Sequence, residues 1–362
     1  MHPVFERLFA VMCMLTCMAG AASAATAPDF RKLNVRVVDT YVLPSFAKLE
    51  KASGKLVSSL EDVCRSGAQS LEAAKRDFAA TVLAWAAVEF LRFGPMSQIG
   101  RPERFFFWPD PRNVTLRQVN AVVAKRDATV LEPQTLIKKS AAVQGLSALE
   151  LLLYDDKHPI AGNDEDARFR CQYAAAIAQT LHAETAAVID EWKRPDGWRR
   201  RIVEPGPGDK PYTNAEGAAG DFARALLTGL QMIQDRQVIP MIEGMGNPAR
   251  PVRLPFARSG LSDRYIGAGV ASAQGLYDAI GLGRNIPRAK AWMPQWITQA
   301  FGRLSRDAPA AVKELGNAKT NPDRERQLRM VRFHVQNIRM LVGREIAPLA
   351  GLAIGFNELD GD

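Results

Sequence analysis

The apolar residues of this chain recur mostly at steps of three and four, the spacing that gathers side chains on one face of an α-helix. The longest such series is Leu33, Val37, Tyr41, Phe46, Leu49, Leu56, Leu60 and Val63. It predicts one long helix that is kinked at Pro44. No segment of any length shows the strict alternation of apolar and polar residues that is typical of a half-buried β-strand. The sequence therefore predicts an all-α fold.

Further helices are expected from the same periodicity and from residues that start or stop helices. A second helix should cover residues 70–93, where a Gly-Pro pair follows. Thr115 and Gln118 have the spacing of a capping box, which predicts the start of a third helix. Residues 143–154 form a fourth apolar helical pattern. A fifth should begin after a cap at Asn163-Asp164 and end before Pro195.

The composition of the sequence changes after the fifth helix, where Pro, Gly and charged residues dominate. We therefore expect a signal peptide over residues 1–24, an N-terminal helical bundle over 25–194, a linker loop over 195–214 and a C-terminal helical bundle over 215–362. Later helices are expected over residues 215–237, 262–280 and 323–352. Gln144-Gly145-Leu146 recurs as Gln274-Gly275-Leu276, which favours two bundles related by internal duplication.

The N-terminus has the parts of a secretory signal peptide. Arg7 precedes an apolar run over residues 8–18, and small residues lead to a cleavage point after Ala24. This run is too short to span a membrane, and no later stretch is long and charge-free enough to do so. We expect a periplasmic protein without a transmembrane segment in the mature chain. A lipoprotein attached at Cys17 is less favoured, because the preceding Leu15-Thr16 lacks the usual small residue.

Removal of the signal peptide would leave Cys64 and Cys171 as the remaining thiols. In an oxidising compartment two cysteines favour one disulfide, here between the first and fifth helices. Two separate buried thiols are the alternative.

The net charge of +8 is unchanged by loss of the signal peptide, which carries one glutamate and one arginine. Outside the cytoplasm a basic surface more plausibly meets anionic envelope components than nucleic acid. The basic clusters at 193–194, 199–201 and 324–326 lack the interleaved aromatic residues of a nucleic-acid groove. We therefore expect no nucleic-acid partner, while a partner in the envelope or in an uptake system stays open.

The fourth helix carries a serine and a carboxylate on one face, because Ser147 and Glu150 are three residues apart. A carboxylate on an apolar face needs a hydrogen-bond donor, a cation or a ligand opposite it. Two interpretations stay open for Glu150. It pairs with an arginine and holds two helices together, or it contacts a ligand in a cleft.

The connection over residues 93–110 is unusually rich in aromatic residues and charges for a solvent loop. Its Phe105 to Trp108 cluster follows Arg101 and Arg104. This loop could roof a cleft and supply cations for Glu150. It could equally fold back and plug the end of the bundle.

In several motifs the chain resembles the imelysin-like proteins of bacterial periplasms and outer membranes. These motifs are Phe93-Gly94-Pro95, Arg101-Pro102-Glu103-Arg104, Phe107-Trp108-Pro109-Asp110, residues 143–153, Arg170-Cys171 and the closing residues 355–362. The resemblance implies two helical bundles with a ligand site between them. It also implies a Gly-x-His-x-x-Glu motif at Gly145, Ser147 and Glu150, in which Ser147 replaces the histidine. The residues expected to bind a ligand are Gly145, Ser147, Glu150, Arg101, Arg104, Trp108 and Asp110.

From this resemblance we expect a non-catalytic periplasmic binding protein that handles iron, another metal or a small ligand. The alternatives are a metallopeptidase and a protein that docks to the envelope through a basic helical surface. Serine is a poor metal ligand, and the mature chain offers only His158, His182 and His334 as further imidazoles. A serine nucleophile is disfavoured, because Ser147 is expected in the middle of a helix without an oxyanion hole. Neither catalytic residues nor a specific cofactor are predicted.

Overall fold

The computed structural model describes residues 29–245, 252–284, 286–313 and 322–352. Every regular element among them is helical, so the predicted all-α fold is confirmed. The signal peptide predicted for residues 1–24 and the closing motif at 355–362 lie outside the described residues.

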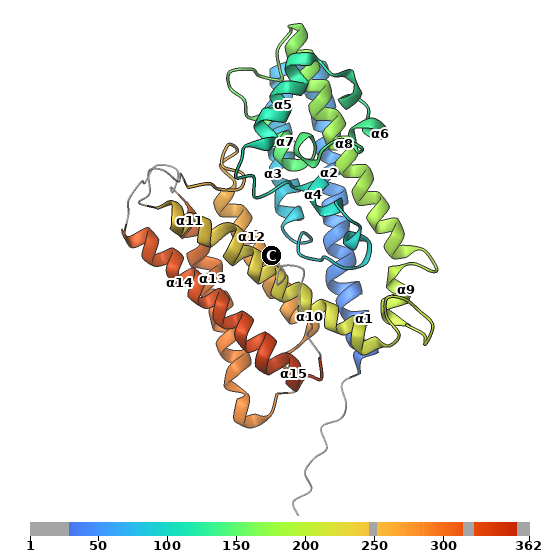
Figure 1. Ribbon diagram of the computed structural model, residues 1–362, viewed down its shortest axis with the longest axis vertical. Coiled ribbons are helices and arrows are strands. Elements are labelled where there is room, and N and C mark those ends of the chain that lie inside the picture. Colours follow the sequence, from blue (N-terminus) through green and yellow to red (C-terminus); the bar gives the residue numbers. More distant parts are fainter. Residues whose placement is uncertain (1–28, 246–251, 285, 314–321, 353–362) are drawn as a thin grey trace, which may run out of the picture.

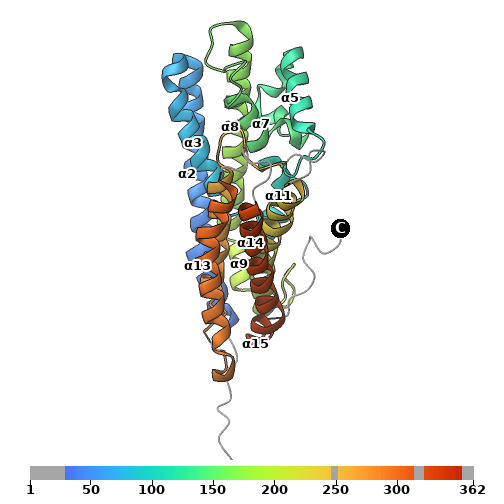
Figure 2. The ribbon, with the colours of Figure 1, turned by 90° about the vertical axis from the view of Figure 1, so that its left-hand side faces the viewer.

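The α-helices divide into two groups that pack mainly within themselves (Figure 1). The first group contains α2 (Leu43–Ser66), α3 (Leu71–Trp85), α4 (Arg101–Phe105), α5 (Val114–Lys125), α6 (Pro133–Leu136), α7 (Gly145–Leu153) and α8 (Glu165–Lys193). The second contains α10 (Ala215–Met232), α11 (Ile239–Gly244), α12 (Ser262–Ile280), α13 (Trp292–Val312), α14 (Pro322–Leu341) and α15 (Ala347–Leu349). The short helix α9 (Trp198–Val203) connects them within the predicted linker. Figure 2 shows α2 and α3 on one side of α8, with α5 and α7 on the other.

The predicted first long helix is present, and it joins the two groups. Its N-terminal part, α1 (Phe30–Val37), packs against α10 and α12, whereas α2 packs against α3 and α8. Between them the π-helical turn η1 (Val38–Val42) ends two residues before Pro44, which is in the first turn of α2. Proline has no N–H to donate, so the irregular turn falls where an ordinary helical bond is lost.

Two helix predictions are corrected by the structure. The second helix ends at Trp85 and not at Phe93, and tight turns follow it. The Ala87 carbonyl in these turns accepts a hydrogen bond from the Tyr41 hydroxyl at 3.0 Å, so a partner from another helix replaces the regular helical bonding. The helix α13 was missed, although Met293, Ile297, Ala300, Phe301 and Leu304 repeat at helical spacing. Its two prolines obscure the pattern, since proline usually stops a helix.

The predicted capping box of the third helix is also wrong. The helix α5 begins at Val114, one residue before Thr115, and the Asp110 carboxylate accepts hydrogen bonds from the backbone N–H groups of both residues, each at 2.8 Å. The cap of α8 is as expected, because the Asp164 carboxylate accepts from the Ala167 N–H at 2.8 Å.

The disulfide between Cys64 and Cys171 is confirmed and joins the last turns of α2 to the first turns of α8. Its ends are separated by 107 residues of sequence, with Cα atoms 5.5 Å apart. It fixes the contact between the two long helices that form the centre of the first group.

Internal duplication stays a prediction. Gln144 precedes α7, whose first residue, Gly145, has a positive φ, whereas Gln274 and Gly275 lie inside the regular helix α12. The repeated tripeptides therefore occupy different structural positions. The division at residues 195–214 likewise stays a prediction.

None of the helices described combines the length and the apolar character needed to cross a membrane.

Candidate functional site

A cavity of ≈ 290 Å³ lies where a loop of the second group covers α5 and α7 of the first. Its walls include Ser147, Glu150, Trp108 and Asp110, which the sequence singled out. The covering segment is 252–258, which precedes α12. Gly145, Arg101 and Arg104 are not among the lining residues. We call this space the Glu150 cavity.

Glu150 is 8% exposed, and its direct partner is a serine. Its Oε1 accepts hydrogen bonds from the Ser259 hydroxyl at 2.6 Å and from the Ser259 backbone N–H at 2.9 Å. Of the two interpretations left open for Glu150, direct pairing with an arginine is therefore not what the structure shows, while contact with a ligand stays a prediction. Burial raises the pKa of the Glu150 carboxyl, while the Ser259 hydrogen bonds and the nearby positive charge of Arg258 act in the opposite direction. The Arg258 backbone N–H makes a weaker contact with the carboxylate, and Oε2 is not among the fully buried polar atoms without a partner.

Ser147 positions the wall of the cavity. It is the third residue of α7 and lies in the first turn, which corrects the expectation that it is mid-helix. Its hydroxyl donates a hydrogen bond to the Phe107 carbonyl at 3.0 Å. This bond attaches the aromatic segment 106–108 to α7. The hydroxyl proton is directed to a carbonyl oxygen and not to a base.

Gly145 allows α7 to begin directly against α4. Its φ is +72°, and a Cβ at this position would lie 2.6 Å from the Phe105 carbonyl oxygen and closer still to that of Arg104. No real Cβ tolerates such contacts with backbone atoms. Glycine is therefore required here for the close approach of two backbones and not for contact with a ligand.

The aromatic loop both roofs the cavity and fills the end of the bundle. Phe105 stacks on Trp85 in the core, with ring centroids 4.8 Å apart. Phe106 stacks between Trp108, at 6.2 Å, and Phe256 of the covering segment, at 4.4 Å. The Trp108 indole donates a hydrogen bond to the Arg236 carbonyl at 3.3 Å. Both interpretations of this loop are thus partly right.

Asp110 contributes to the cavity wall, but its side chain already has partners. Both carboxylate oxygens cap α5, as described above. Its backbone carbonyl accepts a hydrogen bond from the Arg253 guanidinium at 2.8 Å, which fastens the covering segment to the same corner.

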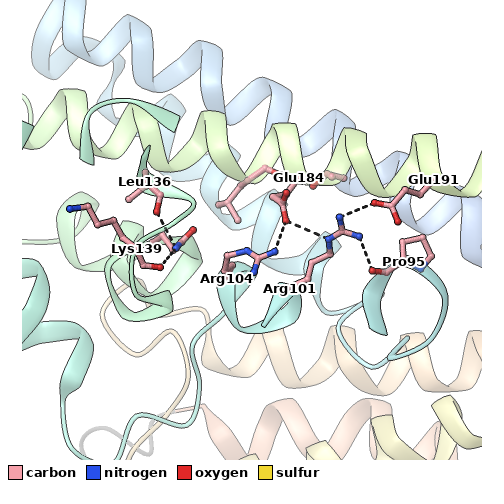
Figure 3. A network of polar contacts seen from close by, with 10 residues as sticks. Pro95, Arg101, Arg104, Leu136, Lys139, Glu184 and Glu191 are labelled. Carbon is pink, nitrogen blue, oxygen red and sulfur yellow. Dashed lines mark hydrogen bonds and ion pairs between the residues drawn. The ribbon is translucent and has the colours of Figure 1, made fainter. Parts of the chain in front are cut away.

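Arg101 and Arg104 do not supply cations for Glu150, which corrects that expectation. They face α8, as Figure 3 shows. Arg101 lies 2.8 Å from Glu191 and 3.5 Å from Glu184, and it donates to the Pro95 carbonyl at 2.7 Å. Arg104 lies 3.1 Å from Glu184. The two glutamates are seven residues apart and share one face of α8, so α4 docks there through its arginines.

Sequence reasoning missed the residues of the covering segment and Ser259, which directly follows it. Ser259, Arg258, Arg253 and Phe256 complete the site, yet no spacing links them to Glu150, which is 109 residues from Ser259. One signal was available, because an aromatic residue, an arginine and a serine are concentrated in the loop directly before α12. Phe256 also has a φ of +56°, a conformation that costs a non-glycine residue about 1 kcal/mol and that its stacking offsets.

The three histidines of the mature chain have separate surroundings. His158 lies 3.1 Å from Asp155 in a loop, and His182 of α8 contacts the Ser53 hydroxyl at 3.1 Å. His334 of α14 is 5% exposed, and burial lowers its pKa. Within the described ranges no three His, Cys, Asp or Glu residues gather into a group able to hold a metal ion.

The basic cluster at 199–201 is engaged in contacts within the protein. Arg199 forms two hydrogen bonds to Asp39, at 2.9 and 2.8 Å, and Arg200 forms two to Asp209. Arg201 lies over the Trp198 ring at 5.6 Å.

Comparisons with known proteins identify relatives by family and by fold. A family model described as imelysin, and named for peptidases, matches residues 42–331. A comparison with curated proteins found no match. The crystal structure of an imelysin-like protein from Psychrobacter arcticum 273-4 superimposes with a TM-score of 0.72 at 18% identity, covering 90% of this chain and 97% of that one. A protein from Parabacteroides distasonis ATCC 8503, provisionally named an iron-regulated protein A precursor, gives a TM-score of 0.69 at 12% identity, with 89% and 95% covered.

Proposed function

The chain belongs to the imelysin family, and from this premise we propose that it is an exported, non-catalytic binding protein that holds a small ligand in the Glu150 cavity. The cavity is formed by residues that are distant in sequence and that come from both helix groups. A ligand held there would contact both groups at once.

The observation that carries this proposal is the state of the Glu150 carboxylate. Its strong hydrogen bonds from Ser259 go to Oε1, while Oε2 is not among the fully buried polar atoms that lack a partner and so can be reached from the cavity. A carboxylate oxygen in such a largely apolar wall can accept a charge-assisted hydrogen bond or an ion pair from a ligand. A ligand that places an N–H, O–H or cationic group against Oε2 would gain this interaction. The aromatic walls from Phe106 and Trp108 would cover the remainder of the ligand.

Iron handling is supported only by the name of the Parabacteroides neighbour and by the family resemblance. The donor set argues against a bare ion in this cavity. A metal ion needs several protein ligands, and here the Asp110 carboxylate already caps α5. If iron is the cargo, we propose that it enters as a complex with an organic ligand whose own atoms complete the coordination.

A peptidase function has less support from the geometry. Serine replaces the histidine of the family motif, and the Ser147 hydroxyl donates to a backbone carbonyl. The histidines that a metal would need lie in a loop, on α8 and on α14, each with different neighbours. Export to the periplasm rests on the sequence pattern of residues 1–24.

Native mass spectrometry and elemental analysis of the natively purified protein test this function. The wild-type protein should retain a small molecule, with or without a metal. Glu150→Gln should lower its affinity roughly tenfold, because a hydrogen bond to a charged group is lost. Ala257→Trp, which adds bulk to the cavity wall, should abolish retention.

Ala128→Trp is the matched control, since Ala128 is exposed and does not line the cavity. It should retain as much ligand as the wild type. A wild-type protein without any bound species, or one whose bound species is unaffected by both cavity variants, would contradict the proposed function.

A further inference from the structure

A second and larger hollow adjoins the Glu150 cavity. It is an open groove of ≈ 1000 Å³ between α5, the segment after α7 and the first turns of α8. Leu116, Leu151 and Arg258 line both spaces, so the groove begins where the Glu150 cavity ends. We call it the basic groove. In Figure 1 the helices that form it lie together at one end of the molecule.

The charges of the basic groove are mostly positive. Its cationic residues are Lys125, Arg126, Lys157, Arg170 and Arg258, against the acids Asp155, Asp156 and Asp166. Two of the acids are already paired: Asp166 with Arg126 at 2.7 Å, and Asp155 with His158 at 3.1 Å. The side chains of Lys125, Lys157 and Arg258 form no ion pair with any described residue. Among the charges of the groove without an ion pair, these three cations outnumber one acid, Asp156, and Arg258 also lies near Glu150 at the junction.

A fourth cation is buried in the wall. Arg170 is 9% exposed, and its nearest acid, Asp155, is 3.6 Å from Nη1. Its buried Nε has no hydrogen-bond partner among the described residues. A buried guanidinium with one weak ion pair keeps a strong positive potential in the groove, because little water screens it.

Apolar residues connect the two spaces. Leu116, Val119 and Val123 of α5 line the groove together with Leu151 and Leu152 of α7. Leu116 is 36% exposed and lies at the junction with the Glu150 cavity. A ligand that extends from the Glu150 cavity into the basic groove would therefore contact apolar side chains before it reaches the cations.

We propose that the basic groove binds the acidic end of the ligand whose other end occupies the Glu150 cavity. This inference rests on the proposed function and specifies the ligand class. The ligand is an elongated organic anion with a hydrogen-bond donor at one end, an apolar middle and an acidic group at the other. Glu150 receives the donor, while Arg258, Lys157 and Lys125 receive the acid.

Two fluorescent probes that differ by a single acidic group test the inference. 11-(Dansylamino)undecanoic acid and its methyl ester share the aromatic rings, one N–H donor and an apolar chain, and only the first carries a free carboxylate at the far end. In fluorescence titrations at low salt, the wild type should bind the acid probe roughly fivefold to tenfold more tightly, since charge-assisted contacts are added. This preference should shrink as salt is raised.

The double variant Lys125→Ala/Lys157→Ala should reduce the preference to roughly twofold or less, with the affinity for the neutral probe unchanged. Both lysines are exposed, so the fold should survive, which circular dichroism melting verifies. Lys55→Ala is the matched control: it removes an exposed lysine of α2 that lines neither space, and it should keep the full preference.

Three results would overturn the inference: equal affinity of the wild type for both probes, an unchanged preference in the double variant, or an equal loss in Lys55→Ala. Displacement of the acid probe by equimolar inorganic phosphate would also overturn it, because the groove would then be a site for free small anions. The proposed function fails separately, if Ala257→Trp leaves the binding of the neutral probe unchanged.

Discussion

Gly145, Ser147 and Glu150 lie within two turns of α7, and each makes a different kind of contact. Gly145 admits the backbone of α4, Ser147 holds the Phe107 carbonyl, and Glu150 accepts hydrogen bonds from Ser259. Two residues of the motif thus shape a wall of the Glu150 cavity, and the third places a carboxylate in that wall. The structural role of Gly145 explains why its substitution should affect folding before it affects binding.

Gly145→Ala should lower the free energy of unfolding by about 3 kcal/mol or more. A positive φ costs an alanine about 1–2 kcal/mol, and the clash of its Cβ with two carbonyl groups adds to this cost. Gly302→Ala is the opposite case, because Gly302 lies inside α13 with no atom within 4 Å of the added Cβ. It should stabilise the protein by roughly 0.5–1 kcal/mol. Urea unfolding of both variants measures the difference, and equal effects would refute the account of Gly145.

For single residues, the sequence predicted which side chains line the cavity better than it predicted their interaction partners. The one-face placement of Ser147 and Glu150 follows from helix geometry, and both line the cavity. Ser259 could not be predicted, since a contact across 109 residues depends on how the second group covers the first. Arg101 was assigned to the wrong acid for the same reason.

Among the elements, α4 and α8 show how a short helix is held by charge. The helix α4 has only five residues, too few to be stable alone, yet its two arginines meet two glutamates of α8. Arg101 is also fixed by the Pro95 carbonyl, so the segment before α4 is anchored by the same side chain. This cluster positions the aromatic loop that roofs the Glu150 cavity.

Arg101→Met should destabilise the protein by about 3 kcal/mol, because it leaves the Glu191 carboxylate without its cation, whereas Glu184 keeps Arg104. The double variant Arg101→Met/Glu191→Gln should recover part of the loss, since Glu191 is then neutral and Glu184 still pairs with Arg104. Chemical denaturation of both measures the recovery. If the double variant is no more stable than the single one, the cost comes from lost packing and not from unpaired charge.

Element boundaries were predictable where a local signal was strong and clear. The ranges of α8 and α12 follow from caps, periodicity and breakers within the elements themselves. The helix α3 ended early because Tyr41 and other distant residues bond to the turns after it, which periodicity does not reveal. The helix α13 was missed because Pro294 and Pro309 suggest breaks, although the first lies in its first turn, where proline is tolerated.

In the whole molecule, buried polar side chains connect the two helix groups. Asn34 of α1 donates to the carbonyls of Ile202 and Ala215, each at 2.9 Å, and Tyr41 donates to those of Ala87 and Ser272. The long helix from α1 to α2 is therefore bonded to both groups along its length. A further connection is a buried carboxyl group whose ionised form is disfavoured by its burial.

That carboxyl belongs to Glu89, in the turns after α3. It accepts hydrogen bonds from the Tyr265 hydroxyl of α12 at 2.7 and 2.6 Å. Burial raises the pKa of Glu89 to about 7, although Tyr265 and the charges of Arg92 and Arg236 oppose the shift. Below its ordinary value of 4.5 the carboxyl is protonated whether the chain is folded or unfolded. Between 4.5 and about 7 only the folded protein holds the proton, so stability falls as pH rises through this window.

Glu89→Gln should remove this dependence, because a glutamine stays neutral at every pH. Near pH 4.5 the variant and the wild type should differ little. By pH 7.5 the variant should have gained about 3 kcal/mol relative to the wild type, the value that a shift of this size implies. Guanidinium unfolding at several pH values between 4.5 and 7.5 gives both stability curves, and their difference isolates Glu89 from the other carboxyl groups.

Glu216→Gln provides the control, since it removes an exposed carboxylate from the first turn of α10. If its curve diverges from the wild type as that of Glu89→Gln does, the effect reflects net charge and not the buried contact. A constant difference between Glu89→Gln and the wild type across the window would mean that Glu89 is ionised in the folded protein. Tyr265 would then connect the two helix groups through a hydrogen bond to an ionised Glu89. The contribution of this bond to the free energy of unfolding would not change between pH 4.5 and 7.5.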